Sequence, residues 1–292
     1  MIPAFFVIGT VFLPLGIILL VSSNGVVEVS KDYTDACIPP VFGNGTSGTQ
    51  VCPITLEVKE QMKAPVYVYY ELTNYYQNHR RYVKSRNDAQ LRGDPPTSES
   101  KLEDCTPRIS SGGSSDPNSF FLPCGLIAWS RFNDTFSLRR PSTNAEVPWT
   151  KDGVAWESDL KEKFNNPPAN SPGIRLTNPD GSILNFEDPD FVVWMRTAGL
   201  PHFRKLYRVI NTDLNPGVYT MVIDSRFPVK QFEGTKSVVL STTSWMGGKN
   251  SFLGLAYIIV GSLCFLLGTI FLIANIARPR NLGDQRYLVW QQ

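Results

Sequence analysis

Four cysteines are the residues in this 292-residue chain whose number and spacing point most directly to chemistry. They fall in one central region, as Cys37, Cys52, Cys105 and Cys124, whereas Cys264 lies in an apolar segment. An even number of cysteines in one region indicates disulfides in an oxidising compartment. Of the three possible pairings we favour nearest neighbours in sequence, because each pair encloses a flexible loop whose closure contributes about 3 kcal/mol. Free thiols and a zinc site are the alternatives, and the lack of a Cys-x-x-Cys pair disfavours zinc.

Two Asn-x-Ser/Thr sequons, at Asn44 and Asn133, fall in the same region as these cysteines. A sequon is glycosylated only where it faces a lumen or the cell exterior. Beyond the second apolar segment lie Arg278, Arg280 and Arg286, which form the positive flank expected on the cytosolic side of a membrane. We therefore expect residues 24–249 to be extracytosolic and both termini to be cytosolic.

Side chains suited to catalysis are sparse. Neither of the two histidines, His79 and His202, lies near a Gly-x-Ser-x-Gly elbow or a metal-spaced cluster. The sequence also lacks a Gly-x-x-x-x-Gly-Lys-Ser/Thr phosphate loop and the Asp-Lys-Thr-Gly type of phosphorylation sequence. The formal net charge of +2 is close to neutral and does not indicate binding to nucleic acid. We therefore expect no catalytic site, metal site or cofactor, and no nucleic-acid partner.

Two apolar segments bracket the cysteine region and must anchor it. Residues 250–277 carry no charged side chain, and residues 1–27 carry none before Glu28. A helix of about 20 residues crosses the hydrocarbon core while satisfying its own backbone hydrogen bonds. We predict membrane helices over 1–23 and 250–277, followed by a tail over 278–292. A cleaved signal peptide is the alternative for the first segment, which however lacks a basic n-region. With no ionisable residue in either span, a carrier acting alone is not expected.

Three features are candidate surfaces for a partner or for the membrane. Glycines recur every seven residues on one face of the second span, at Gly254, Gly261 and Gly268. Small residues let another helix approach closely, although glycine is also simply common in membrane helices. Trp245 precedes that span, where an interfacial belt is expected. Arg80 and Arg81 lie on the polar face of a helix predicted over 72–85, and they are either a docking surface or a solvated face paired with carboxylates.

The region between the spans predicts a β-rich fold. Alternating or β-branched runs at 62–70, 217–224 and 237–243 are bounded by turn signals. Residues 122–136 predict short buried strands, with Trp129, Phe132 and Phe136 in the core. Residues 139–189 predict long loops pinned by Trp149 and Trp156. The fold class is two transmembrane α-helices bracketing a large β-rich, antiparallel sandwich-like extracytosolic domain with long loops and two disulfides.

Four long segments carry a family resemblance. They are YYELTNYYQNHRRYVKSR (69–86), PCGLIAWSRFNDTF (123–136), DFVVWMRTAGLPHFRKLYRVI (190–210) and FEGTKSVVLSTTSWMGGKNSFLG (232–254). In this order and between two spans, they closely resemble the signature segments of the flippase accessory subunits. These are the non-catalytic beta subunits of type-IV P-type ATPases, the Lem/Cdc-fifty family.

The resemblance implies a heterodimer with the catalytic alpha subunit of such an ATPase, which moves phospholipid from the outer or lumenal leaflet to the cytosolic leaflet. The accessory subunit would contact membrane lipids, and the ATPase would need it for folding, for exit from the endoplasmic reticulum and for activity. The resemblance places the complex in the endoplasmic reticulum or in Golgi, endosomal or plasma membranes. Cys37 with Cys52 and Cys105 with Cys124 match the family's bridges, and Asn133 matches a family glycosylation site. Asn44 lies in a variable loop. An independent receptor or adhesion glycoprotein is the alternative function.

Overall fold

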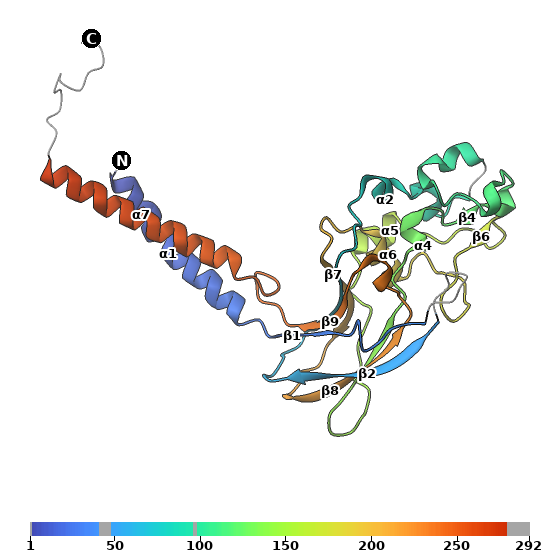
Figure 1. The fold of residues 1–292 in the computed structure, drawn as a ribbon, viewed down its shortest axis with the longest axis horizontal. Coiled ribbons are helices and arrows are strands. Elements are labelled where there is room, and N and C mark those ends of the chain that lie inside the picture. The colour runs from blue at the N-terminus through green and yellow to red at the C-terminus, as the bar shows by residue number, and fades with distance from the viewer. Residues whose placement is uncertain (1, 41–47, 96–97, 279–292) are drawn as a thin grey trace, which may run out of the picture. The chain divides into compact units, whose positions relative to one another are not determined.

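The computed structural model describes residues 2–40, 48–95 and 98–278, and the chain divides into two compact units. One unit comprises residues 1–27 and 243–292, and the other comprises residues 28–242. The first contains two long helices, α1 (Ile2–Asn24) and α7 (Phe252–Ala277), which lie side by side (Figure 1). Both helices are long and apolar enough to cross a membrane.

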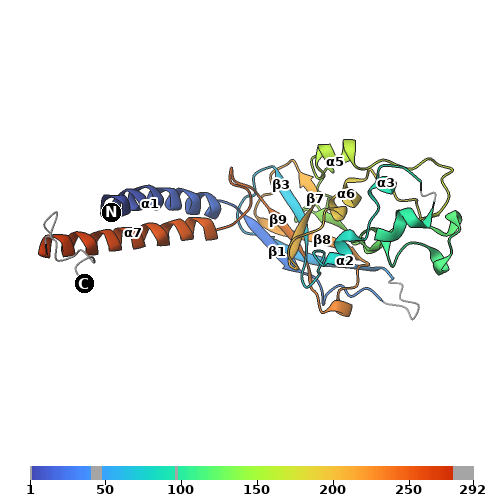
Figure 2. The same cartoon turned by 90° about the horizontal axis from the view of Figure 1, so that it is seen from above.

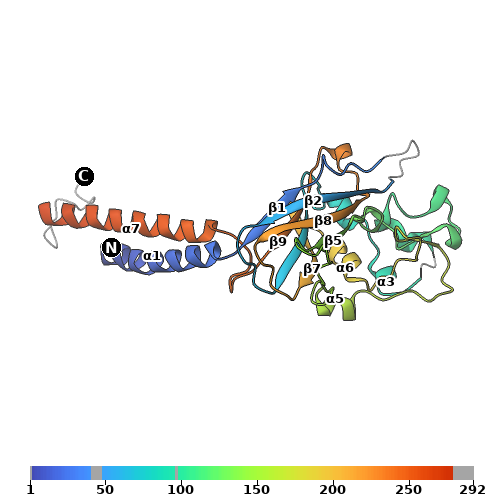
Figure 3. The ribbon, with the colours of Figure 1, turned by 90° about the horizontal axis from the view of Figure 1, so that it is seen from below.

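The second unit is built on two antiparallel sheets. The larger sheet has the order β1-β9-β3-β7, which can be followed in Figure 2. The smaller has the order β2-β8-β5, and Figure 3 shows β2 and β8 side by side. The strands are β1 (Glu28–Asp32), β2 (Gln50–Val58), β3 (Val66–Leu72), β5 (Thr135–Arg139), β7 (Phe203–Ile210), β8 (Gly217–Ser225) and β9 (Lys236–Ser241). A short parallel pair, β4 (Phe121–Leu122) with β6 (Ile174–Arg175), is separate from both sheets.

The core lies where the two larger sheets face each other. Along β2 and β8 buried and more exposed residues alternate, as expected when one face of a sheet meets the core. Every residue of β9 is buried. Phe136 of β5 meets Tyr207 of β7 edge to face, with ring centroids 5.0 Å apart, so that aromatic side chains join the two sheets.

Short helices complete this unit, mostly on the side of the sheets away from β2 and β8 (Figure 1). The α-helices are α2 (Arg80–Lys84), α3 (Asp88–Leu91), α4 (Leu126–Trp129), α5 (Glu157–Glu162) and α6 (Pro189–Met195). The 3-10 helices are η1 (Glu99–Cys105), η2 (Ser111–Gly113), η3 (Pro117–Ser119) and η4 (Lys230–Phe232). None exceeds seven residues, so tertiary packing rather than helix propensity must hold them.

The antiparallel, β-rich architecture with two disulfides confirms the predicted fold class, and the structure corrects three local predictions. The helix predicted over 72–85 is helical only in α2, because Asn74 adopts a positive φ of 55° and the Tyr75 ring joins an aromatic cluster with Trp194 and Phe227. The strands predicted over 122–136 are interrupted by α4. Trp156 is 66% exposed and therefore does not anchor the core.

Candidate functional site

The glycine face of α7 is occupied by α1 of the same chain, which corrects its assignment to a partner. A Cβ atom at Gly254 would lie 2.7 Å from the backbone nitrogen of Leu20, and one at Gly261 would lie 3.1 Å from Leu13. Gly268 is equally confined, because its Cβ would lie 3.2 Å from the ring of Phe6. Removing side chains at these positions lets the two backbones approach closely.

The N-terminal helix contributes matching glycines to this contact. A Cβ atom at Gly9 would lie 2.6 Å from the ring of Phe265, and one at Gly16 would lie 2.8 Å from Ile258. Their spacing of seven equals that of the α7 glycines. The sequence signal that could have revealed an intrachain helix pair is this seven-residue glycine spacing, which the two spans share.

Both favoured disulfides form in the structure. Cys37–Cys52 joins the segment after β1 to strand β2, with Cα atoms 5.9 Å apart. Cys105–Cys124 joins the end of η1 to the segment after β4, with Cα atoms 5.6 Å apart. The second bridge lies in a buried cluster with Leu102 and Phe120, so it closes a small satellite core.

The remaining surface candidates are exposed. Arg80 and Arg81 lie on α2, and within the described residues neither has an ion pair with a carboxylate. Trp245 is 76% exposed. Exposure leaves these three side chains available for contact, and their role in binding stays a prediction. Asn44 lies outside the described residues.

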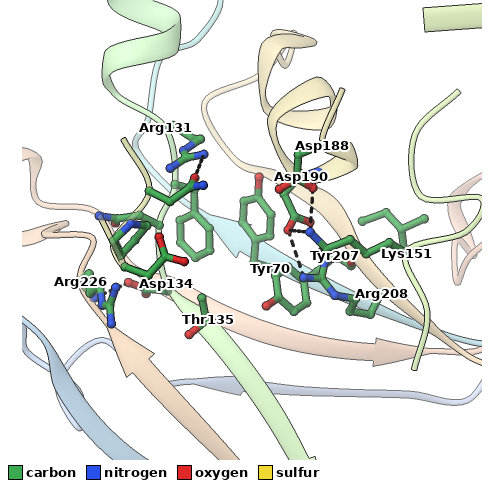
Figure 4. Close-up of a pocket in the computed structure, with 16 residues that line it drawn as sticks. Tyr70, Arg131, Asp134, Thr135, Lys151, Asp188, Asp190, Tyr207, Arg208 and Arg226 are labelled. Carbon is green, nitrogen blue, oxygen red and sulfur yellow. Dashed lines mark hydrogen bonds and ion pairs between the residues drawn. The ribbon is translucent and has the colours of Figure 1, made fainter. Parts of the chain in front are cut away.

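A cavity of about 350 Å³ opens in the β-rich unit beside the second sequon (Figure 4). One wall carries an ionic cluster from α6, β7 and the loop before α5. The Lys151 ammonium contacts Asp188 at 2.7 Å and Asp190 at 2.9 Å. The two guanidinium nitrogens of Arg208 donate to the two carboxylate oxygens of Asp190, at 2.6 and 3.0 Å. Burial disfavours the charge on Lys151, but its hydrogen bonds to both aspartates outweigh burial and raise its pKa.

The opposite wall carries Arg131 and Asn133, from the loop between α4 and β5. Arg131 donates to the side-chain oxygen of Asn178 at 3.0 Å, and burial lowers the pKa of its guanidinium despite three nearby aspartates. The side-chain oxygen of Asn133 is buried and has no hydrogen-bond partner among the described residues. Between the walls, the rings of Tyr70 and Phe132 stack in parallel with centroids 4.0 Å apart. The cavity thus combines aromatic faces with hydrogen-bonding groups.

The middle residue of this sequon, Asp134, is a buried structural anchor. Its carboxylate accepts from Lys236 at 2.7 Å and from the Tyr33 hydroxyl at 3.0 Å. The backbone N–H groups of Arg226 and Phe227 donate to its other oxygen. The Lys236 ammonium also donates to Ser225 and to the Phe227 carbonyl, both at 2.8 Å. Burial lowers the pKa of Lys236, and Asp134 opposes that shift.

A second buried lysine stabilises the end of α6. The Lys205 ammonium donates to the carbonyls of Val193 at 2.9 Å and Trp194 at 3.0 Å, and also to that of Arg196. These carbonyls would otherwise lack partners at the helix C-terminus. Burial lowers the pKa of Lys205 to about 7.

Sequence reasoning missed both lysines and the cavity. The signal was available in β7 and β9, where a lysine stands on the same strand face as apolar residues, Lys205 with Phe203 and Lys236 with Val238. A charged residue there predicts a buried polar network. The partners themselves come from distant segments, and no spacing along the chain identifies them.

Comparison with known proteins gives one consistent result. A model of the LEM3 (ligand-effect modulator 3) family / CDC50 family matches residues 19–281. The chain is 45% identical to "ALA-interacting subunit 3" of Arabidopsis thaliana, over 100% of this chain and 84% of that protein. It is 41% identical to "Cell cycle control protein 50A" of Bos taurus, over 94% of this chain and 82% of that protein. It is 40% identical to "Cell cycle control protein 50B" of Homo sapiens, over 94% of this chain and 87% of that protein.

Proposed function

Because this chain belongs to the LEM3/CDC50 family, we propose that it is the non-catalytic accessory subunit of a phospholipid flippase. Its partner is the catalytic alpha subunit of a type-IV P-type ATPase, with which it forms a heterodimer. The partner moves phospholipid from the outer or lumenal leaflet to the cytosolic leaflet. The observation that carries this proposal is the similarity to a protein named as an interacting subunit, which extends over the whole chain.

The subunit acts by binding and not by catalysis. ATP hydrolysis and phosphorylation belong to the partner, and this chain supports its folding, its exit from the endoplasmic reticulum and its activity. A rigid β-rich unit with two disulfides suits that role, because a preformed surface loses little conformational freedom on association. Arg80 and Arg81 are exposed side chains that this surface can use, and Trp245 is an exposed side chain of the unit that contains the two long helices.

Within the membrane, the partner contacts the outward faces of the helix pair. The glycines are already used between α1 and α7, whereas Val11, Ile18, Ile259 and Leu266 are exposed. Helix packing in lipid depends on van der Waals fit rather than on water exclusion, so these branched side chains must fit grooves on the partner's helices. Lipid tails cover whatever area the partner leaves.

We further propose that both termini are cytosolic and that residues 24–249 face the lumen or the cell exterior. The two disulfides and the sequons at Asn44 and Asn133 support this orientation, because both features belong to that side. We also propose that the two asparagines carry glycans. The complex resides in the endoplasmic reticulum and in Golgi, endosomal or plasma membranes.

Co-purification from the native membrane tests this function. We expect mild-detergent extraction of the tagged chain to recover a P-type ATPase in about equimolar amount, identified by mass spectrometry. We also expect deletion of the chain to retain that ATPase in the endoplasmic reticulum and to reduce lipid asymmetry. Recovery of the chain without a stoichiometric ATPase, together with intact lipid asymmetry after deletion, would instead favour an independent receptor or adhesion protein.

A further inference from the structure

We propose that the cavity beside Asn133 holds the first N-acetylglucosamine of a glycan attached to that residue. The sugar is then a packed component of the fold as well as a surface modification. This inference rests on the glycosylation of Asn133 proposed above. It goes further by assigning a binding site inside the β-rich unit to the sugar itself (Figure 4).

The sequon is held in place at the cavity. Asp134 is fully buried and fixed by its ion pair with Lys236, so the backbone on either side of it is fixed as well. Asn133 immediately precedes it and lines the cavity. The buried, unpartnered oxygen of Asn133 needs a donor, since an unsatisfied buried acceptor is costly. A hydroxyl or acetamido N–H of an attached sugar can supply that donor.

The walls suit a pyranose ring. Tyr70, Phe132 and Tyr207 give the cavity apolar aromatic surface. Arg131 makes one hydrogen bond, to Asn178, although a guanidinium carries five N–H donors. The other donors of Arg131 are therefore available to sugar oxygens. The acceptor oxygen of Asn178 and the carboxylate of Asp180, on the loop at the same rim, complete the polar lining.

The balance of charge argues for a neutral ligand. The lining contains four cationic side chains, Arg131, Lys151, Arg208 and Arg226, and four acidic ones, Asp134, Asp180, Asp188 and Asp190. The acidic groups at the N-terminus of α6, the N-cap Asp188 and Asp190, are already paired with Lys151 and Arg208. A phosphate or a carboxylate ligand would therefore meet no net positive charge. The volume of about 350 Å³ falls in the range of small-ligand sites, and a neutral, hydroxyl-rich ligand fits both properties.

The attachment chemistry requires one co-reactant, a lipid-linked oligosaccharide diphosphate in the lumen. The side-chain amide nitrogen of Asn133 forms a bond to C1 of the first sugar and loses a proton, and the lipid diphosphate leaves with the electrons of the broken C1–O bond. The carbonyl oxygen of Asn133 is unchanged and still needs its hydrogen-bond donor.

Differential enzymatic release tests this burial. The full chain with Asn44→Gln, made with its partner in cells that attach high-mannose glycans, retains Asn133 as its one sequon. Endoglycosidase H cuts between the first two sugars, whereas peptide N-glycosidase F must reach the asparagine–sugar bond. We expect endoglycosidase H to cleave the folded protein readily. We expect peptide N-glycosidase F to release the glycan at least about tenfold more slowly from folded than from unfolded protein, because release requires local opening.

Cavity variants separate this site from shielding by other surfaces. Arg131→Ala and Asn178→Ala each remove part of the lining but retain the sequon, and both are expected to accelerate release by peptide N-glycosidase F from folded protein. Arg140→Ala, which removes an exposed arginine outside the lining, is the matched control and is expected to leave the rate unchanged.

Three results would overturn the inference. Equal release rates from folded and unfolded protein would show that the sugar lies outside the cavity. If release by peptide N-glycosidase F from folded protein stays slow in both cavity variants, a surface other than the cavity shields the asparagine–sugar bond. A peptide mass spectrum without sugar on Asn133 would overturn the glycosylation and, with it, this use of the cavity. None of these results affects recovery of the ATPase. The proposed function is therefore tested independently, by the co-purification experiment above.

Discussion

Asp134 and Lys236 form an ion pair whose side chains are 0% and 1% exposed. Removing two charges from water is costly, and here the cost is offset by hydrogen bonds from Tyr33 and two backbone N–H groups. The pair joins the segment after β1, the sequon loop and the first residue of β9. Its energetic role is therefore to fix three segments that are distant in sequence.

We predict that Asp134→Ala lowers the free energy of unfolding by about 3–5 kcal/mol, because it leaves the buried Lys236 charge unpaired. Thermal unfolding of the purified protein, followed by intrinsic fluorescence, measures the change. The sequon requires only Asn133 and Thr135, so it remains intact and loss of glycosylation does not confound the result. A double variant, Asp134→Ala with Lys236→Met, should recover part of the loss. A single variant as stable as the wild type would show that the pair carries no such role.

At the scale of elements, the glycines of α1 and α7 determine how the two spans meet. The contact alternates glycine with bulky rings, as where Gly9 faces Phe265 and Gly268 faces Phe6. Packing of this kind tolerates little added volume, because backbone and not a flexible side chain lies opposite Gly254.

We predict that Gly261→Leu separates α1 from α7 and reduces the yield of folded, partner-bound protein several-fold. Overpacking of this kind typically costs about 1–3 kcal/mol, and here Leu13 lies opposite the new side chain. Size-exclusion chromatography in mild detergent, with quantification of the bound ATPase, measures the yield. Ser262→Leu adds similar bulk at the neighbouring exposed position, on a face that we propose meets the partner, so it serves as the control for folding alone, and the two variants are compared by the yield of monodisperse free chain. Equal losses from both variants would contradict a specific role of the glycine contact.

Elements defined by local pattern were predictable from the sequence, and those defined by distant contacts were not. Strands β8 and β9 follow from runs of β-branched residues between turns, and both spans follow from length and apolarity. The helix predicted over 72–85 was largely wrong, because Tyr75 and Gln77 serve other segments. Tyr75 packs on Trp194, and the side-chain oxygen Oε1 of Gln77 accepts from the backbone N–H of Ala198. The apolar residues over 72–85 recur every three or four residues because they pack against distant segments, and not because they form one face of a helix.

The candidate site shows the same limit. The sequon and the cysteines can be recognised directly in the sequence, because each is a short local pattern. The disulfides in the structure join the favoured pairs. The cavity beside Asn133 needs residues from the α4–β5 loop, β3, α6 and β7, which only the folded chain brings together. The prediction that the glycine face of α7 lets another helix approach closely was physically correct, but the helix that packs there is α1 of the same chain.

At the scale of the whole molecule, function depends on a surface that recognises another protein. Two adjacent arginines, Arg80 and Arg81, are exposed on α2 without an ion pair among the described residues. Exposed charges contribute little to stability, and they change association rates when the partner carries complementary charge. The two side chains are therefore candidates for binding whose replacement should leave the fold intact.

We predict that Arg80→Glu with Arg81→Glu reduces recovery of the partner ATPase at least about tenfold at low salt, with a smaller reduction at high salt, because screening weakens the interaction of exposed charges. Quantitative mass spectrometry of the co-purified complex measures recovery, and the thermal midpoint of the free chain should stay unchanged. The matched control is Arg139→Glu with Arg140→Glu, an exposed adjacent pair at the end of β5. If both double variants lose the ATPase equally, net charge rather than the α2 surface governs association. If neither loses it, recognition lies elsewhere on the β-rich unit or on the outward faces of α1 and α7.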